Sequence, residues 1–273
     1  MKAAVIPNYE KINIKSYVDE VCSVLENNGI IVNVADEGEE IIDESCDFII
    51  IIGGDGTIIH NAKKAAVYNK PILGINTGRL GFMAGLEVNE LSRLSALKTG
   101  DYETEKRMML DITVESNNGS KEFLAFNDIV VAKSVTSRIV DISVKCDGAD
   151  MSKYRADGLI VSTPTGSTAY AISAGGPVID PLLDSLMITP ICPHSLFSRS
   201  ILVKEDSLLE ISCDIRPCSE VMLTIDGEEY IQLSGDENVK VRKSPDKSAQ
   251  LIKIKGDSFY HIFKRKMRDR MDI

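Results

Sequence analysis

The feature that most constrains the fold is a continuous apolar run that ends in a glycine-rich loop. Phe48–Ile52 contains only apolar residues, and Gly53-Gly54-Asp55-Gly56-Thr57 follows it directly. A short apolar run bounded by glycines is typical of a parallel strand that is buried on both faces. Helical spacing of apolar residues begins at Ile58. The loop is therefore expected at the carboxyl end of a sheet strand, where open α/β folds bind their ligands.

The segments around this strand predict a small layered α/β domain. Ala3–Ile6 and Ile30–Val34 have the composition of short strands, and Pro71–Ile75 repeats the apolar pattern after the next helix. Between the first two strands, apolar residues recur at helical spacing from Ile14 to Leu25. Residues 1–98 are accordingly expected to form an α/β domain with a doubly wound parallel sheet.

The period of the apolar pattern changes to two after the linker-like residues Lys98–Asp101. Apolar and polar residues alternate in Val140–Cys146 and again in Leu209–Cys213, and Asp226-Gly227 is a hairpin-type turn. This alternation is typical of antiparallel strands with one buried face. Residues 102–255 are therefore expected to form an all-β, sandwich-like domain.

The last segment, residues 256–273, predicts a helix that packs back on the body of the protein. Ser258 is a candidate N-cap, and Phe259, Ile262 and Phe263 follow at helical spacing. A basic helix lying on a membrane surface is the alternative, but the apolar face is short for that purpose.

The charge balance limits the classes of partner. The chain has 31 Lys and Arg against 41 Asp and Glu, a formal net charge of −10. Such a field repels polyanions and argues against a nucleic-acid-binding surface, so phosphates have to be bound locally by backbone amides, a metal or a few placed cations. No apolar run approaches the roughly 20 residues of a membrane span, and the first residues lack a signal-peptide pattern, so a cytoplasmic location without membrane contact is expected.

The glycine loop carries one carboxylate, Asp55. Its three glycines permit close backbone approach and positive φ angles, so that N–H groups can face a phosphate chain. The loop lacks the lysine of a P-loop and the third glycine of a dinucleotide fold. An aspartate here can take a proton from a hydroxyl group or hold a metal, both of which phosphoryl transfer requires. A simple N-cap or turn is the alternative reading.

A second unusual segment is Tyr154–Tyr170, in which a strand-like half is followed by a turn rich in Ser and Thr. Hydroxyl groups beside small residues suit a slot for a ribose and a flat base. A turn that only caps a following helix at Ala169–Ala174 is the alternative.

Taken together, these motifs resemble those of NAD kinases of the bacterial type. Gly53–Thr57, Asn127-Asp128, Tyr154–Tyr170 and Thr189–His194 follow one another in the order and at the spacing of that family, over nearly the whole chain. Diacylglycerol and sphingosine kinases and phosphofructokinases share the glycine loop, whereas the block Arg155–Tyr170 resembles NAD kinases alone.

The resemblance implies an activity. NAD kinases transfer the γ-phosphoryl group of ATP, or of polyphosphate, to the 2′-hydroxyl of the adenosine ribose of NAD, and NADP is formed. It also implies a need for Mg²⁺, Mn²⁺ or another divalent cation, and a homodimer or homotetramer. Two alternatives stay open: a lipid kinase that shares the loop, and a non-catalytic dinucleotide-binding sensor. The acidic charge and the hydroxyl-rich block argue against the lipid kinase, and Asp55 argues against the sensor.

The resemblance also implies roles for individual residues. Asp55 matches the catalytic base. The phosphate-binding residues are expected to be Gly53, Gly54, Thr57 and Arg79, the last in a turn that follows the strand Pro71–Ile75. The NAD-binding residues are expected to be Gly56, His60, Asn127, Asp128, Arg138, Arg155, Asp157, Thr165, Thr168, Ala169, Tyr170, Ser173 and Glu228. No fixed set of protein ligands is expected for the metal, which is to arrive with ATP.

Two positions depart from the family pattern. Asp128 stands where Glu is commoner, which shortens the side chain by one methylene. Glu228 stands where several members have Gln, which replaces a neutral amide by an anion that only accepts hydrogen bonds. The roles of Glu228 and of His194 stay open.

Overall fold

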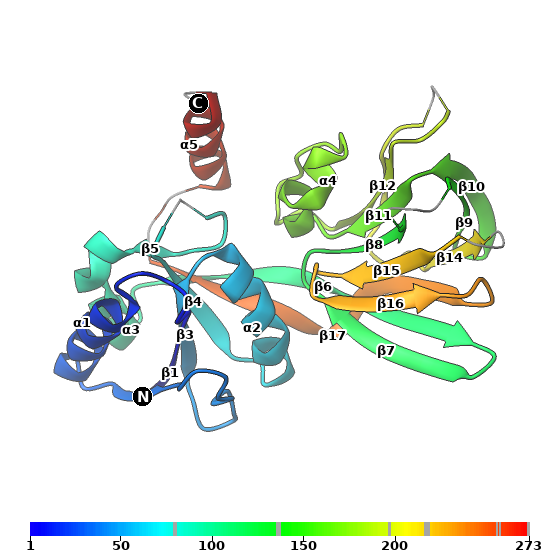
Figure 1. The fold of residues 1–273 in the computed structure, drawn as a ribbon. Helices are drawn as coiled ribbons and strands as arrows, with labels where there is room; N and C mark the ends of the chain where they lie inside the picture. The colour runs from blue at the N-terminus through cyan, green and yellow to red at the C-terminus, as the bar shows by residue number, and fades with distance from the viewer. Residues whose placement is uncertain are drawn as a thin grey trace. The chain divides into compact units, whose positions relative to one another are not determined.

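The computed structural model describes residues 1–78, 81–134, 138–195, 198–215, 219–254, 256 and 258–271. It divides into two compact units, which Figure 1 shows as ribbons. Unit 1 comprises Met1–Arg107 and Lys247–Ile273, and unit 2 comprises Met108–Asp246. Unit 1 is thus assembled from two separate stretches of sequence, whereas unit 2 is continuous.

Unit 1 is built on the expected parallel sheet. Its strands are β1 (Lys2–Pro7), β2 (Ile31–Val34), β3 (Phe48–Gly53) and β4 (Pro71–Asn76), in the order β2-β1-β3-β4. The short β5 (Leu86–Glu87) pairs with β4, as does the end of the long β17 (Asn238–Lys253). All six residues of β3 are buried, which confirms the central strand predicted from its apolar run.

The helices of unit 1 cover both faces of this sheet. One face packs against α1 (Ile14–Asn27) and against the 3₁₀ segment η1 (Val88–Ser95), which α3 (Ala96–Thr99) continues. The opposite face receives α2 (Asp55–Val67), since the side chain of Ile58 lies against Gly74 of β4. The sheet is therefore doubly wound, as expected.

The last helix, α5 (Phe259–Met271), begins as predicted. The Ser258 hydroxyl accepts a hydrogen bond from the His261 N–H at 3.4 Å, which is the contact an N-cap makes. Ile262 is buried, and the Phe259 ring packs on Phe82 of unit 1 with centroids 5.9 Å apart. The prediction that the helix packs back on the body is confirmed.

Unit 2 is the expected antiparallel β sandwich. One sheet has the order β13-β12-β11-β8-β15-β16, and the facing strands include β10-β9-β14-β17 and the hairpin of β6 with β7. Apolar side chains from the inner faces of both layers form one core. The strands not yet given are β6 (Glu103–Ser116), β7 (Gly119–Ala125), β8 (Asp128–Lys133), β9 (Val140–Cys146), β10 (Ala149–Ala156), β11 (Gly158–Ser162), β12 (Ser185–Ile191), β13 (Ile201–Lys204), β14 (Leu209–Asp214), β15 (Val221–Ile225) and β16 (Glu229–Leu233).

The outer face of the β8-β11-β12 layer is covered as well. A 3₁₀ turn, η2 (Thr165–Thr168), and the short helix α4 (Tyr170–Ser173) follow β11. Ala171 of α4 packs on Ile160 of β11 in a second, smaller apolar cluster. Because β11 is buried on both faces, its residues Leu159–Val161 are all apolar and do not alternate with polar ones.

No helix in the described ranges is both long and apolar enough to span a membrane.

Candidate active site

The glycine loop joins β3 to α2 at the carboxyl end of the unit 1 sheet. Asp55 is the first residue of α2, where a carboxylate interacts favourably with the helix dipole. None of the loop glycines has a positive φ, and Gly54 is extended at φ −111° and ψ −177°. The positive φ angles that the glycines permit are therefore not used. A Cβ at Gly54 or Gly56 would meet nothing within 4 Å, so the loop offers open space at both positions.

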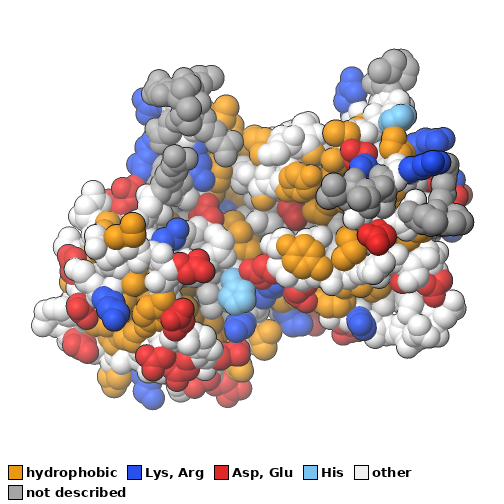
Figure 2. Space-filling view, in the orientation of Figure 1, with side chains coloured by type: hydrophobic (Ala, Val, Ile, Leu, Met, Phe, Trp, Pro, Cys, Tyr) orange, Lys and Arg blue, Asp and Glu red, His pale blue; other side chains and the backbone are white. Residues whose placement is uncertain are grey.

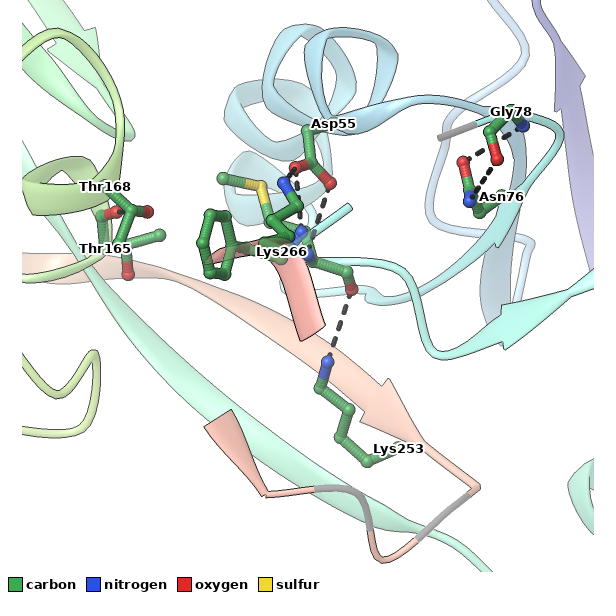
Figure 3. Close-up of polar contacts among 9 residues, drawn as sticks. Asp55, Asn76, Gly78, Thr165, Thr168, Lys253 and Lys266 are labelled. Atoms are coloured by element: carbon green, nitrogen blue, oxygen red, sulfur yellow. Dashed lines mark hydrogen bonds and ion pairs between the residues drawn. The ribbon is translucent and has the colours of Figure 1, made fainter. Parts of the chain in front are cut away.

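The Asp55 carboxylate is oriented by the backbone of a second turn. It accepts hydrogen bonds from the N–H groups of Phe82, at 2.8 Å, and Met83, at 3.2 Å. A Cβ at Gly81 would lie only 2.1 Å from Asp55 Oδ1. Any residue other than glycine at position 81 would therefore clash with the carboxylate. The Lys266 ammonium lies 3.6 Å from Asp55 Oδ2 (Figure 3).

Polar side chains at the ends of the neighbouring strands support the same edge. The Asn8 side chain, just after β1, donates a hydrogen bond to the Thr57 hydroxyl at 3.0 Å. The Asn76 side chain, at the end of β4, exchanges hydrogen bonds with the backbone of Gly78 (Figure 3). Sequence reasoning did not select Asn8 or Asn76 as site residues, although each follows a predicted strand. Arg79 lies outside the described residues.

In unit 2, the backbone of Asn127 and Asp128 is held by Asp226. The Asp226 carboxylate accepts hydrogen bonds from the N–H groups of Phe126, Asn127 and Asp128 at 2.8, 2.7 and 3.2 Å. Asp226 has a φ of 50° and Gly227 a φ of 71°, as expected for the turn between β15 and β16. The sequence indicated this turn but not the hydrogen bonds that its carboxylate accepts.

Asp128 itself is a buried acid. Only 5% of the residue is exposed. Burial, and after it the nearby charge of Asp226, raise the pKa of the Asp128 carboxyl group to about 7. Near neutral pH this group is therefore partly protonated and can donate a hydrogen bond as well as accept one.

The hydroxyl-rich turn after β11 packs directly on Asn127. The Thr163 N–H donates to the Asn127 carbonyl at 2.8 Å, and the Thr163 hydroxyl donates to the Phe126 carbonyl at 3.0 Å. A Cβ at Gly166 would lie 2.2 Å from the Asn127 carbonyl oxygen, so glycine is needed for this contact. The structure thus brings together two predicted motifs that are more than thirty residues apart.

Several buried polar atoms at this contact have no hydrogen-bond partner among the described residues. They are Asn127 Oδ1, Ser162 Oγ and Thr165 Oγ1. Buried polar atoms are almost always hydrogen-bonded, so atoms of this kind in one cluster indicate a place for a polar ligand. Ser162 was not among the predicted site residues. It does belong to the Ser- and Thr-rich segment expected to line a ribose slot, and it pairs with Asp128 across the sheet.

Two other predicted residues, Arg155 near the end of β10 and Asp157 just before β11, lie away from this cluster. Gly158 pairs with Ala132 and Ser162 with Asp128, so Asp157 is about 20 Å from Asn127 along the strands. There Asp157 faces the Lys133 ammonium at 3.8 Å, and the carbonyl of the exposed Arg155 accepts a hydrogen bond from His194 N–H at 2.8 Å. The structure does not bring Arg155 and Asp157 into the Asn127 cluster.

The remaining predicted residues lie mostly at the surface. His60 is exposed on α2 of unit 1, and the exposed ones in unit 2 are Arg138, Tyr170, Ser173 and Glu228. Thr168 and Ala169 are half-buried, and the Thr168 hydroxyl donates to the Thr165 carbonyl at 3.2 Å (Figure 3). Within the described ranges, no three or more His, Cys, Asp or Glu side chains gather in a way that could hold a metal ion.

Comparisons with known proteins agree with this arrangement. The ATP-NAD kinase N-terminal domain family matches residues 8–102, and the ATP-NAD kinase C-terminal domain family matches residues 126–254. The NAD kinase of Natranaerobius thermophilus is 38% identical over 282 residues, which cover 98% of both chains. This chain belongs to the NAD kinase family. Another NAD kinase, from Lachnoclostridium phytofermentans, is 36% identical over 98% of this chain and 99% of its own.

Solved structures of NAD kinases share the fold. An NAD kinase from Archaeoglobus fulgidus in complex with ATP superposes with a TM-score of 0.79 at 26% identity and covers 98% of this chain and 99% of its own. Yeast NADH kinase complexed with NADH has a TM-score of 0.84 at 20% identity, covering 98% of this chain and 87% of its own, and shows the fold alone. The protein is a phosphotransferase of this family, and the lipid-kinase and sensor alternatives are not favoured.

Proposed function

We propose that this member of the NAD kinase family transfers the γ-phosphoryl group of ATP to the 2′-hydroxyl of the adenosine ribose of NAD, giving NADP and ADP. The observation that supports this most directly is the Asp55 carboxylate, fixed by two backbone N–H groups beside the open positions Gly54 and Gly56. The Archaeoglobus relative was solved with ATP and the yeast one with NADH, which supports nucleotides as the substrates.

In this proposal Asp55 is the general base. It takes the proton of the 2′-hydroxyl as that oxygen attacks the γ-phosphorus, while the bond from phosphorus to the bridging oxygen of ADP breaks. The two N–H groups hold the carboxylate in one orientation, so no side-chain freedom is lost during the reaction. Gly53, Gly54, Thr57 and Arg79 are the residues proposed to bind the phosphates of ATP.

A divalent cation fits this arrangement as a companion of ATP. Asp55, at the start of α2 beside the open positions Gly54 and Gly56, is a carboxylate that could contact a metal carried by the triphosphate. When bound there, Mg²⁺ or Mn²⁺ would neutralise part of the negative charge of the phosphates.

The cluster in unit 2 is proposed to bind NAD. The unpartnered oxygens of Asn127, Ser162 and Thr165 suit the hydroxyl and amide donors of a dinucleotide. Asp128, with a pKa near 7, can donate to a ligand oxygen. The further contacts to NAD expected from the family are Gly56, His60, Arg138, Arg155, Asp157, Thr168, Ala169, Tyr170, Ser173 and Glu228.

The family resemblance also supports a homodimer or homotetramer and a cytoplasmic location, and we include both in the proposal. It likewise supports the division of labour between an α/β part, residues 1–98, that handles phosphates and a β-rich part, residues 102–255, that binds NAD, with residues 256–273 returning to the body. Polyphosphate is an alternative phosphoryl donor.

The test replaces Asp55 by asparagine, with Asp19→Asn on the exposed face of α1 as the matched control. NADP formation is followed with an NADP-specific dehydrogenase, and NAD affinity by calorimetry. We expect turnover of the Asp55 variant to fall by about 10²–10⁴-fold, the usual contribution of a general base, with NAD affinity kept and the control unchanged. Near-normal turnover in a folded variant would contradict the role of Asp55. Absence of NADP from the wild-type protein with either donor and either metal would refute the function.

A further inference from the structure

Helix α5 brings a cluster of aromatic and charged side chains onto unit 1. The Phe259 ring lies 5.9 Å from Phe82, and the Phe263 ring stacks on Phe259 at 6.2 Å. Arg265 forms an ion pair with Glu87 at the end of β5. The helix is thus fixed to unit 1 by apolar packing at one point and by a charge pair at another.

These contacts place Lys266 at the candidate catalytic carboxylate. Its ammonium lies 3.6 Å from Asp55 Oδ2 and 3.9 Å from the centroid of the Phe82 ring (Figure 3). The side chains of Lys266 and Asp55 are only 22% and 25% exposed. An aromatic face and a carboxylate both attract a cation, so the ammonium is held at this position.

The glycine loop needs a cation that its own sequence lacks. Gly53–Thr57 contains neither Lys nor Arg, and the whole chain carries a net charge of −10. In P-loop enzymes a lysine of the loop reaches the β- and γ-phosphates, and much of the catalysis of phosphoryl transfer is charge neutralisation. Figure 2 shows basic side chains on α5, at the upper left; both acidic and basic side chains are spread over the remaining face in view.

Distance favours Lys266 for this task. A general base lies about 2.6–3.2 Å from the hydroxyl oxygen that it deprotonates. That oxygen in turn lies about 3–3.5 Å from the phosphorus it attacks. The γ-phosphorus is therefore within about 7 Å of the Asp55 carboxylate. An ammonium 3.6 Å from the same carboxylate can reach a phosphoryl oxygen by rotating its last torsions.

We propose that Lys266 is a phosphate-binding residue of this kinase, which pairs with Asp55 in the free enzyme and binds the γ-phosphoryl oxygens when ATP enters. This inference rests on the proposed function and deepens it. The exchange of partners leaves the Asp55 carboxylate free to take the hydroxyl proton, while the lysine neutralises the charge of the phosphoryl group.

The test compares Lys266→Met and Lys266→Arg with Lys264→Met. Lys264 is exposed on the same helix, two residues away, so its substitution removes the same charge without altering the site. We expect kcat/KM for ATP to fall about 10²-fold in Lys266→Met and by less in Lys266→Arg, with KM for NAD and the melting temperature unchanged. Lys264→Met is expected to match the wild type.

Binding measurements separate phosphate contact from a purely structural role. A non-hydrolysable ATP analogue and AMP are titrated by calorimetry into wild type and Asp55→Asn, each with and without Lys266→Met. We expect the analogue to bind about tenfold more weakly whenever Lys266 is lost, including in the Asp55→Asn background, and AMP to bind equally well throughout.

Three results would overturn the inference. One is a loss of affinity that disappears in the Asp55→Asn background, since the lysine would then act only through Asp55. Another is an equal loss for AMP, which indicates structural damage. The third is equal activity of Lys266→Met and Lys264→Met. Wild-type NADP formation is measured first, because its absence refutes the proposed function, whereas an active wild type with an unaffected Lys266→Met refutes only this inference.

Discussion

Replacing Asp128 by asparagine is expected to change the unfolding free energy more favourably at alkaline pH than at acidic pH. The pKa of the Asp128 carboxyl group is raised from 3.8 to about 7 by burial and by Asp226. Between these two values the unfolded chain has lost the proton while the folded protein retains it. The contribution of this carboxyl group to the unfolding free energy is therefore fully present below about pH 4 and is lost as the pH rises to about 7.

The size of the effect follows from the shift. One pKa unit corresponds to about 1.4 kcal/mol, so the wild type loses roughly 3 kcal/mol of unfolding free energy from this group between pH 5 and pH 8. Asparagine has nearly the same volume and does not titrate. Burying the amide changes the unfolding free energy by the same amount at both pH values, so this change cancels when pH 5 and pH 8 are compared.

The assay is urea unfolding of wild type and Asp128→Asn at pH 5 and pH 8. Far-UV circular dichroism is a suitable probe, because the chain contains no Trp. Asp150→Asn is the control, since the Asp150 side chain is 93% exposed in the same unit. The unfolding free energy of Asp128→Asn, taken relative to that of wild type at the same pH, should rise by about 3 kcal/mol from pH 5 to pH 8. A change no larger than that of the control would refute a raised pKa for Asp128.

Two glycine substitutions test the close contacts at the site. Gly81→Ala should push the Asp55 carboxylate aside by about 1 Å and lower kcat for NADP formation by about 10²-fold. The control is Gly256→Ala, because a Cβ at Gly256 meets open space. Gly166→Ala should push the turn after β11 away from the Asn127 carbonyl and raise KM for NAD about tenfold, while leaving KM for ATP unchanged. It should also lower the unfolding free energy, measured in urea, by about 1–3 kcal/mol. Normal kinetics in either variant would contradict the corresponding contact.

Local pattern in the sequence was sufficient for much of the fold. The apolar run Phe48–Ile52 predicted β3 to within one residue, and the alternation in Val140–Cys146 predicted β9 with its bounds. Both signals are local, because burial on one face makes adjacent residues alternate between apolar and polar, whereas burial on both faces makes them all apolar. The long strand β17 was harder to predict, since it passes through the turn-like residues Ser244-Pro245-Asp246 without ending.

The surroundings of the site were less predictable because they depend on contacts between distant residues. Asp55 was identified from its loop, but the turn at Phe82 and the helix carrying Lys266 are 27 and 211 positions away. Asp226 likewise reaches Asn127 across 99 positions. No periodicity links such residues, and only the packed structure brings them together.

The discontinuity of unit 1 has a consequence for the order of synthesis. Unit 2 is complete once Asp246 has been made, whereas the unit 1 sheet waits for Gln250 and Leu251 to pair with β4. Domains generally fold as they emerge from the ribosome. In this chain the whole of unit 2 is therefore synthesised before the strand residues that complete the unit 1 sheet.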